Sequence, residues 1–408
     1  MMVAHVAAVA AGLIVALCGS GRARAHEVEP DAIPDAGVRV ALAAAATLAD
    51  ARQPWPSSRL PGVLDTGQGW RDSRGLALEY AVADLAGRVA PALAWQWAMG
   101  LHDRDDPHVE AAWLDWRVSD AVYLGAGRNT VPTTPALSQA GHLDRFAAVP
   151  LAKRALFDGN WTDDGIVLAW RPAEPAAGWR PSRASVGLWR GQAFPAGGRE
   201  PESIGDLPIT ASAGWVLAEA WSLDAFVARM TPIARGRLVQ ADGAGHTHGS
   251  PTCEDTLTGR ACFDGRVNLW GGTLAWRPNA DWALSATALV RHESGALYSS
   301  GGDANYRGRL QGWWADAVWR LDTDWELAAR AERLAARHDL RGPGASLVAA
   351  DAGLQGNRPS SRMSLAATWL GIEGVRWSLE AGDDHVGADE NPYVMLRAVW
   401  RFSTEWGW

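Results

Sequence analysis

Apolar and polar residues alternate along most of this chain. In the clearest segment, Trp282 is followed at alternate positions by Leu284, Ala286, Ala288 and Val290. A period of two predicts a β-strand, because successive side chains of a strand point to opposite faces of a sheet. The alternation returns in segments of roughly ten residues separated by turn-forming residues, a length typical of strands that cross a membrane. The pattern therefore predicts an all-β chain.

Pairs of tryptophans bracket short polar turns three times in the C-terminal half, at 276–282, 319–325 and 369–377. Two strands joined by a short turn form a hairpin. Tryptophan at the mouth of each hairpin is typical of a membrane interface, where the amphipathic indole is favoured. A sheet that spans a bilayer must close on itself to satisfy its backbone. The pattern favours a transmembrane antiparallel β-barrel over a large soluble β-sandwich or propeller with core tryptophans.

The alternating segments number about sixteen, an even count that suits a bacterial barrel. A tight turn is expected at 84–87, and the strand before it is expected to place Tyr80 and Val82 on the lipid face. Long and short connections alternate, which predicts long extracellular loops and short periplasmic turns. We expect strands at 38–47, 74–82, 88–99, 108–118, 121–129, 164–171, 183–190, 209–217, 221–230, 266–276, 282–291, 306–319, 325–335, 362–369, 376–381 and 393–402.

Composition narrows the class of protein further. Hydrophobic residues make up 48% of the 408 residues, yet no apolar run long enough for a helical membrane span follows the N-terminus. Lys+Arg is 38 and Asp+Glu is 46, so the chain is mildly acidic. A nucleic-acid partner would favour a basic face, and we expect none.

The N-terminus has the features of a secretory signal peptide over residues 1–25. An apolar stretch at 6–17 leads to the small-x-small sequence that ends at Ala25, and cleavage is expected after this residue. The remaining chain, 26–408, is expected to form a single barrel domain in the bacterial outer membrane. Its last strand ends close to aromatic residues at Phe402 and at the C-terminus, which resembles the signal by which barrels are recognised for insertion.

A barrel of this size encloses an aqueous channel. Arginine outnumbers acidic residues among the inward positions, and such a lining favours anions. The alternative is that facing arginine and glutamate side chains pair and cancel. Side-chain parity places these charged residues inward: Arg39, Arg88, Arg117, Arg183, Arg291, Arg307, Arg309, Arg330, Arg362, Arg376, Arg397 and Arg401, with Glu79, Asp115, Glu326, Glu332 and Glu380.

The connection at 130–162 is the candidate constriction, because one long early loop can fold into the lumen and narrow it. Arg128 lies at its start, and Arg145, Lys153 and Arg154 lie within it. In a narrow mouth of low dielectric constant these charges would focus the electric field and concentrate anions. The alternative is an ordinary solvated loop.

Residues 110–116 (Glu-Ala-Ala-Trp-Leu-Asp-Trp) and 124–132 (Leu-Gly-Ala-Gly-Arg-Asn-Thr-Val-Pro) resemble the phosphate-selective porin O and P family. There a similar strand–turn–strand leads into the long inward loop, and Gly127 and Pro132 match that step. The resemblance covers 76–171 and implies a sixteen-stranded, trimeric, anion-preferring channel. The phosphate-specific members also use lysine clusters, whereas Lys153 is the only lysine here. The resemblance therefore does not extend to phosphate specificity.

A polar loop at 231–265 holds Cys253 and Cys262. In an exported protein such a pair is expected to form a disulfide, and two metal-bound thiolates are the rival interpretation. His246 and His248 lie nearby and suggest a soft or borderline metal site, with a solvated loop as the alternative.

Motifs for catalysis are absent from the sequence. It contains no Gly-x-Ser-x-Gly, no His-Glu-x-x-His and no haem-attachment Cys-x-x-Cys-His. We therefore expect no catalytic residues and no cofactor. The expected function is an outer-membrane porin that passes small anionic or neutral hydrophilic solutes, assembles as a homotrimer and contacts membrane lipid and lipopolysaccharide. The alternatives are a channel for a scarce metal or its complex, which uses the histidine and cysteine loop, and a barrel enzyme.

Overall fold

The structure is a computed structural model. It describes residues 33–34, 37–51, 60, 63, 75–101, 107–140, 144–157, 159–173, 178–197, 204–233, 235–238, 260–354, 359–386 and 389–406. The predicted signal peptide at 1–25 lies outside these residues. Among the described residues, no helix is long and apolar enough to cross a membrane.

Antiparallel strands form nearly all of the described structure. Three short helices and one 3-10 turn accompany them: α2 (Pro135–Gln139), α3 (Leu151–Phe157), α4 (Ala345–Asp351) and η2 (Ile204–Asp206). The strands are β1 (Val38–Ala51), β2 (Gly75–Ala90), β3 (Leu93–Leu101), β4 (His108–Arg117), β5 (Val122–Thr130), β6 (Thr162–Trp170), β7 (Arg183–Trp189), β8 (Ile209–Ala218), β9 (Trp221–Met230), β10 (Arg235–Leu238), β11 (Arg260–Trp276), β12 (Trp282–Ser299), β13 (Gly302–Arg320), β14 (Trp325–Arg341), β15 (Ser360–Ile372), β16 (Val375–Val386) and β17 (Asp389–Trp406).

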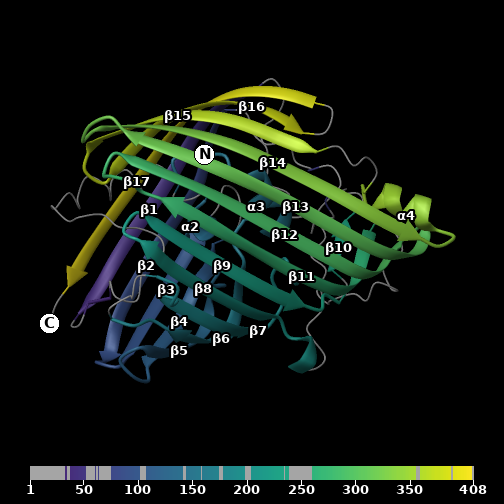
Figure 1. Cartoon of the computed structure of the whole chain (residues 1–408), viewed down its shortest axis with the longest axis horizontal. Helices are drawn as coiled ribbons and strands as arrows, with labels where there is room; N and C mark the ends of the chain where they lie inside the picture. Colours follow the sequence, from purple (N-terminus) through teal and green to yellow (C-terminus); the bar gives the residue numbers. More distant parts are fainter. Residues whose placement is uncertain are drawn as a thin grey trace.

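The strands close into one ring because β1 pairs with both β2 and β17 (Figure 1). The other strands pair with their neighbours in chain order, and β9 and β10 share one place because both pair with β11. The result is the predicted closed, sixteen-stranded antiparallel barrel. Closure satisfies the backbone hydrogen bonds of every strand, which is what a bilayer-spanning sheet requires.

The paired tryptophans form a row across neighbouring strands. Trp282 lies opposite Trp319, with stacked rings 5.5 Å apart, and Trp221 stacks on Trp276 at the same separation. Trp325 continues the row on the next strand. Four of these side chains are about 40% exposed on the outside of the barrel, and Trp276 is half-buried beside Trp221. The hairpin prediction is therefore confirmed.

One bulge reverses a predicted face. Tyr80 and Val82 were expected on the lipid side, but they are 0% and 7% exposed and face inward. The register with β1 shifts at this point, so that Ala45 pairs with Tyr80 while the next residue pairs with Leu78. The extra residue, Glu79, exchanges the two faces of the rest of the strand.

Two further expectations about turns are wrong. The predicted turn at 84–87 is part of β2, and the chain turns instead around Pro91. Long and short connections do not alternate strictly, because only two residues separate β12 from β13 and β16 from β17. These strands continue well past their predicted ends, since pairing along the hairpin satisfies the backbone even where the residues alternate less clearly.

The connection between β5 and β6 lies inside the barrel. Its helix α3 contacts the inner faces of β12, β13, β14 and β15 (Figure 1). A close approach shows how tightly it packs, because a Cβ atom added at Gly312 of β13 would lie 2.7 Å from the Cβ of Ala152. The long loop after β14, which carries α4, lies at the opposite end of the barrel from the C-terminus.

Candidate functional site

Arginines on the inner faces of β14–β17 hold the backbone of the inward loop. Their guanidinium groups donate to carbonyl oxygens of residues 144–149, and charged donors make hydrogen bonds stronger than those between neutral groups. The bonds run from Arg330 to Ala148 (3.4 Å), Arg362 to Val149 (3.0 Å), Arg376 to Asp144 (2.6 Å), and Arg397 to Asp144 (3.1 Å) and Phe146 (3.3 Å). We call these four residues the arginine belt.

Three inward glutamates bind N–H groups of the same loop. Glu380 accepts a hydrogen bond from the backbone N–H of Ala147 at 2.7 Å. Glu332 accepts from the N–H of Leu151 at 2.6 Å, and Glu326 pairs with Arg145 at 2.7 Å. Arg330 also forms ion pairs with Asp144 of the loop and Asp316 of β13. Buried charges are therefore matched on both partners, as burial demands.

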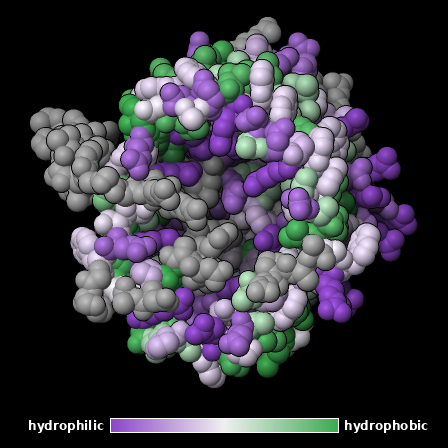
Figure 2. Space-filling model, turned by 60° about the vertical axis from the view of Figure 1, so that its left-hand side comes forward, coloured by the Kyte–Doolittle hydropathy of each residue, from purple (hydrophilic) through white to green (hydrophobic). Residues whose placement is uncertain are grey.

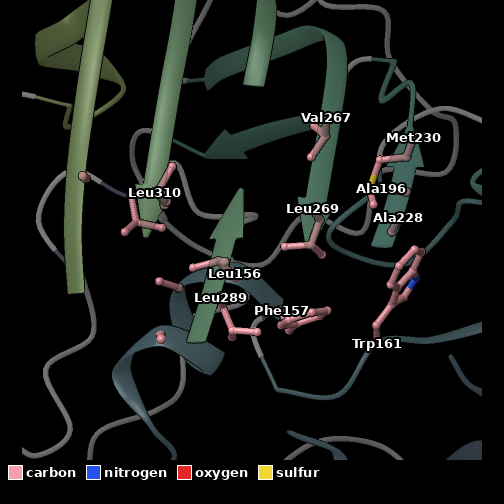
Figure 3. Packing of buried hydrophobic residues seen from close by; sticks show 14 of the residues in the cluster. Leu156, Phe157, Trp161, Ala196, Ala228, Met230, Val267, Leu269, Leu289 and Leu310 are labelled. Carbon is pink, nitrogen blue, oxygen red and sulfur yellow. The ribbon is translucent and has the colours of Figure 1, made fainter. Parts of the chain in front are cut away.

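The other side of the loop is apolar. Leu156, Phe157 and Trp161 are at most 3% exposed and pack into a cluster with Leu289 and Leu310 of the barrel wall. Figure 3 shows these side chains converging from α3 and from the strands. A hydrophobic core therefore fills this part of the barrel interior, and it fixes the position of the loop.

The predicted constriction residues in the loop are held by other parts of the protein. Lys153 is 2% exposed, and its ammonium group donates to the carbonyl of Ala140 and to Asn160, both at 2.6 Å. It therefore stabilises the loop from within. Arg154 is 8% exposed in the same helix, and Arg145 is engaged with the wall as described. Their assignment to anion binding stays a prediction.

Arg128 lies at the start of the loop and is bound to β-sheet neighbours. Its Nε donates to the carbonyl oxygen of Val109 at 2.9 Å, and its Nη1 lies 3.4 Å from Asp164. The ion pair lies on the outer face of the barrel, because Asp164 shares its face of β6 with Ile166 and Leu168, each 54% exposed. Arg128 therefore does not face the lumen, contrary to the expectation that it lines the constriction.

The predicted lumen residues divide into two groups. Arg362 and Arg397 are each 1% exposed and belong to the arginine belt. Arg117, by contrast, is exposed at the end of β4, where it lies 3.4 Å from the carbonyl oxygen of Pro91 in the neighbouring turn. It therefore lies at the rim of the barrel.

A second group of inward arginines lies near the barrel end where β1 begins and β17 ends. Arg39 is the second residue of β1, Arg376 is the second residue of β16, and Arg88 lies near the end of β2. Arg401 of β17 is within hydrogen-bonding reach of the inward Tyr80. We call these four arginines the terminal arginine group, and Arg376 belongs to both groups. Figure 2, which turns this end forward, shows a hollow with hydrophilic residues along its margins.

Two arginines that were expected inside are outside. Arg307 and Arg309 are exposed on the face of β13 that also carries Trp313, whereas Leu310 and Trp314 of the other face are at most 1% exposed. Parity is intact, but the apolar face of this part of β13 is the inner one. The reason is that it packs against the loop helices and not against lipid.

The predicted disulfide and metal site of the loop at 231–265 lie only partly within the described residues. Cys262 is disulfide-bonded, while Cys253, its predicted partner, lies outside the described residues. His246 and His248 lie outside them too. Among the described residues no group of three or more His, Cys, Asp or Glu side chains could hold a metal ion.

The glutamates that anchor the loop were not singled out as functional from the sequence. A signal was available, because Glu326, Glu332 and Glu380 occupy inward positions of strands whose other inward residues are largely arginine or small. Acidic residues surrounded by arginine on an otherwise apolar sheet indicate a buried polar partner. That partner is the backbone of the loop.

Comparison with known proteins gives a fold relationship. No family model and no curated protein matches the chain. A loop-deletion mutant of OmpT, an outer membrane protein of Vibrio cholerae, superposes with a TM-score of 0.57 at 12% identity, over 90% of this chain and 100% of that one. Salmonella typhi OmpF in complex with daunomycin gives 0.52 at 12% identity, over 90% and 98%. The resemblance to the phosphate-selective porins stays a prediction, and the fold is that of outer-membrane β-barrel proteins.

Proposed function

We propose that this chain is an outer-membrane porin, a passive channel for small hydrophilic solutes that is narrowed by the loop at 130–162. The observation that carries the proposal is the inverted polarity of the barrel wall. On β15 the outward Met363 and Leu365 are 65% and 66% exposed, whereas the inward Arg362 and Ser364 are 1% and 3% exposed. Apolar residues outside and charged residues inside suit a water-filled barrel in lipid. No part of this proposal requires a catalytic group or a cofactor.

A mild preference for anions is the second part of the proposal. The terminal arginine group brings four guanidinium groups to one end of the interior, and Arg376 is close enough to Arg397 and Arg401 for their charges to interact. Acidic side chains nearby are fewer: Asp84 and Glu405 interact with Arg39, and Asp84 also accepts a hydrogen bond from Gln96 at 2.7 Å. A surplus of positive charge in a confined interior raises the local concentration of anions.

Export and assembly complete the proposal. We infer that residues 1–25 direct export and are cleaved after Ala25, and that the barrel assembles as a homotrimer. The trimer form of OmpT of Vibrio cholerae is similar to this chain in fold, with a TM-score of 0.54 at 12% identity. The trimer of that protein supports the inference.

Liposome swelling tests the channel with solutes matched in size. The mature chain, 26–408, is reconstituted and exposed to glucose, gluconate or glucosamine. We expect all three to enter, with gluconate faster than glucosamine. The difference should shrink in the variant Arg88→Gln/Arg401→Gln and persist in Arg117→Gln at the rim. Liposomes that no solute enters, or a faster rate for glucosamine, would overturn the proposal.

A further inference from the structure

The outward face of β11–β16 contains a hollow with a volume of about 800 Å³. Small side chains form its floor, because Ala286 lies opposite Ala315, Ala315 opposite Ala331, and Ala317 opposite Ala329 on neighbouring strands. Larger residues, among them Trp276 and Met363, rise at its two sides. The hollow is apolar and large enough for part of an acyl chain.

Four arginines lie directly beyond this hollow on the same face. Arg333 lies two residues after Ala331 on the same face of β14, and Arg309 lies directly opposite Arg337. Arg307 is beside them, and all four side chains are exposed. Like charges directly opposite each other in a sheet are unfavourable, so this arrangement calls for an anionic partner. We call these residues the outer arginine cluster.

The described residues do not supply that partner. Asp339, the acid opposite Arg307, forms its ion pair with Arg341 at 2.7 Å instead. Within the described part of the chain, no salt bridge joins any member of the outer arginine cluster to a carboxylate. The negative charge must therefore come from outside the described barrel wall.

The height of the cluster identifies the source of the charge. Trp319 marks the tryptophan row on β13, and the strand between it and Arg309 spans roughly 25 Å of bilayer at the usual strand tilt. Arg307, Arg309 and Arg337 therefore lie at the far boundary of the apolar band, where lipid headgroups lie, and Arg333 lies between them and the hollow. Arginine matches phosphate in geometry and charge, and an ion pair at such a boundary is screened less than one in water.

We propose that the outer face of β12–β14 binds a phosphorylated lipid of the outer leaflet, lipopolysaccharide. One acyl chain occupies the alanine-floored hollow, and a headgroup phosphate lies on the outer arginine cluster. This site rests on the proposed membrane location but does not depend on conductance through the barrel. A second copy of the chain fits less well, because it would bring apolar surface against four unpaired guanidinium groups.

Native mass spectrometry of the purified mature protein, incubated with lipopolysaccharide, tests the site. We expect wild-type barrels to retain about one lipid each, and Arg309→Gln/Arg337→Gln to retain roughly tenfold less at the same lipid concentration. The matched control, Arg180→Gln/Arg277→Gln, removes two exposed arginines from connections between strands and should retain lipid as the wild type does. Equal retention by the two double variants would overturn the proposal.

Three further arms separate the sources of binding. Dephosphorylated lipopolysaccharide should be retained poorly, inorganic phosphate alone should not be retained, and Ala315→Leu/Ala331→Leu should weaken lipid retention by filling the hollow. If phosphate alone binds as well, the cluster is an anion site without a lipid. If the arginine variant changes the oligomer mass and not the lipid content, the face is a contact between copies. Either result overturns the lipid site.

Conductance of the same variants separates this proposal from the proposed function. We expect the arginine variant to conduct as the wild type does, because the cluster faces away from the lumen. A wild-type barrel that retains lipid but conducts no ions would remove the channel and leave the lipid site. A conducting barrel with no retained lipid would do the reverse.

Discussion

The two halves of strands β13 and β14 have opposite polarity. In the half nearer the tryptophan row, the inner face carries charge, as at Arg330, and the outer face is apolar, as at Leu327. In the other half the inner face is apolar, as at Leu310, and the outer face carries charge, as at Arg309. The alternation of side chains continues without a break from one half to the other.

The reversal shows that alternation fixes only which residues share a face. What each face contacts is decided by its surroundings. In the half nearer the tryptophan row, the lower half, the inner face contacts the polar backbone of the loop. In the other half, the upper half, the inner face contacts the apolar side of the same loop. Outside, lipid gives way to headgroups at the height of Arg309. An exchange of residues between the two halves should therefore be costly in both directions.

Arg330→Met should give the largest effect. The substitution removes the partner of Asp144 and Asp316 and a cation–π contact with Phe146 at 4.3 Å. Breaking a buried ion pair from one side costs about 3–5 kcal/mol. Urea unfolding followed by tryptophan fluorescence measures this loss. Arg309→Met in the outer arginine cluster should change the free energy of unfolding by less than about 0.5 kcal/mol. Equal losses in the two variants would refute the assignment of the faces.

Leu310→Ala should be the next largest. Leu310 is 0% exposed inside the upper half, and truncating a buried leucine costs about 2–5 kcal/mol. Leu327, 38% exposed on the lipid side of the lower half, provides the matched substitution Leu327→Ala. Lipid tails can replace the lost contacts there, so its cost should be clearly smaller. Calorimetric unfolding in the same lipid compares the two, and the reverse order would contradict the packed interior.

Ala329→Arg tests the outer face of the lower half. An arginine facing lipid near the midplane costs about 2–4 kcal/mol, whereas one near the interface costs about 0–1 kcal/mol. Gln311→Arg introduces the same side chain on the outer face close to Arg309 and should be tolerated. Folding efficiency into lipid vesicles as a function of urea measures both. Similar costs would mean that the two positions lie at the same depth.

Acid should break the ion pair between Asp144 and Arg330 only at low pH. Burial opposes ionisation of Asp144, but the charge and hydrogen bond of Arg330, with smaller contributions from Arg145, outweigh it and lower the pKa of this loop carboxyl below its ordinary value of 3.8. A lowered folded pKa stabilises the docked loop above the ordinary value, and that stability disappears as the pH falls through the folded value. The part of the conductance change that depends on Asp144 should therefore appear only below about pH 4.

Asp144→Asn is the control for the acid effect. An asparagine carries no charge to lose, so its conductance at neutral pH should already resemble that of the acid-treated wild type. An Asp144→Asn variant whose acid response equals that of the wild type would show that the Asp144–Arg330 ion pair does not set the response.

The sequence alone predicts the barrel because period-two patterning and the tryptophan pairs are local features. Strand ends were less predictable, as Pro91 shows, since pairing extends strands beyond the clearest alternation. The bulge at Glu79 could not be foreseen, because a single inserted residue leaves no mark in composition. Inward arginines were identified by parity, but their partners were not. Those partners are backbone atoms of a distant loop, which only the tertiary fold brings to Arg330 and Arg397.

The polarity of Arg307 and Arg309 could not be assigned from the sequence for a related reason. Charged residues were expected inside because lipid was assumed to surround the whole strand. The strands extend beyond the apolar band, and there the inner face is the drier one. Burial, and not the residue type, decides which side of a strand is polar.

The reversal potential of the reconstituted wild-type barrel tests the proposed function most directly. Purified mature protein is inserted into a planar bilayer that separates concentrated from dilute KCl. A water-filled channel with the terminal arginine group at one end should conduct in discrete steps and give a reversal potential of the sign set by chloride. A potential set by potassium would contradict the anion preference, and a bilayer without conductance steps would contradict the channel itself.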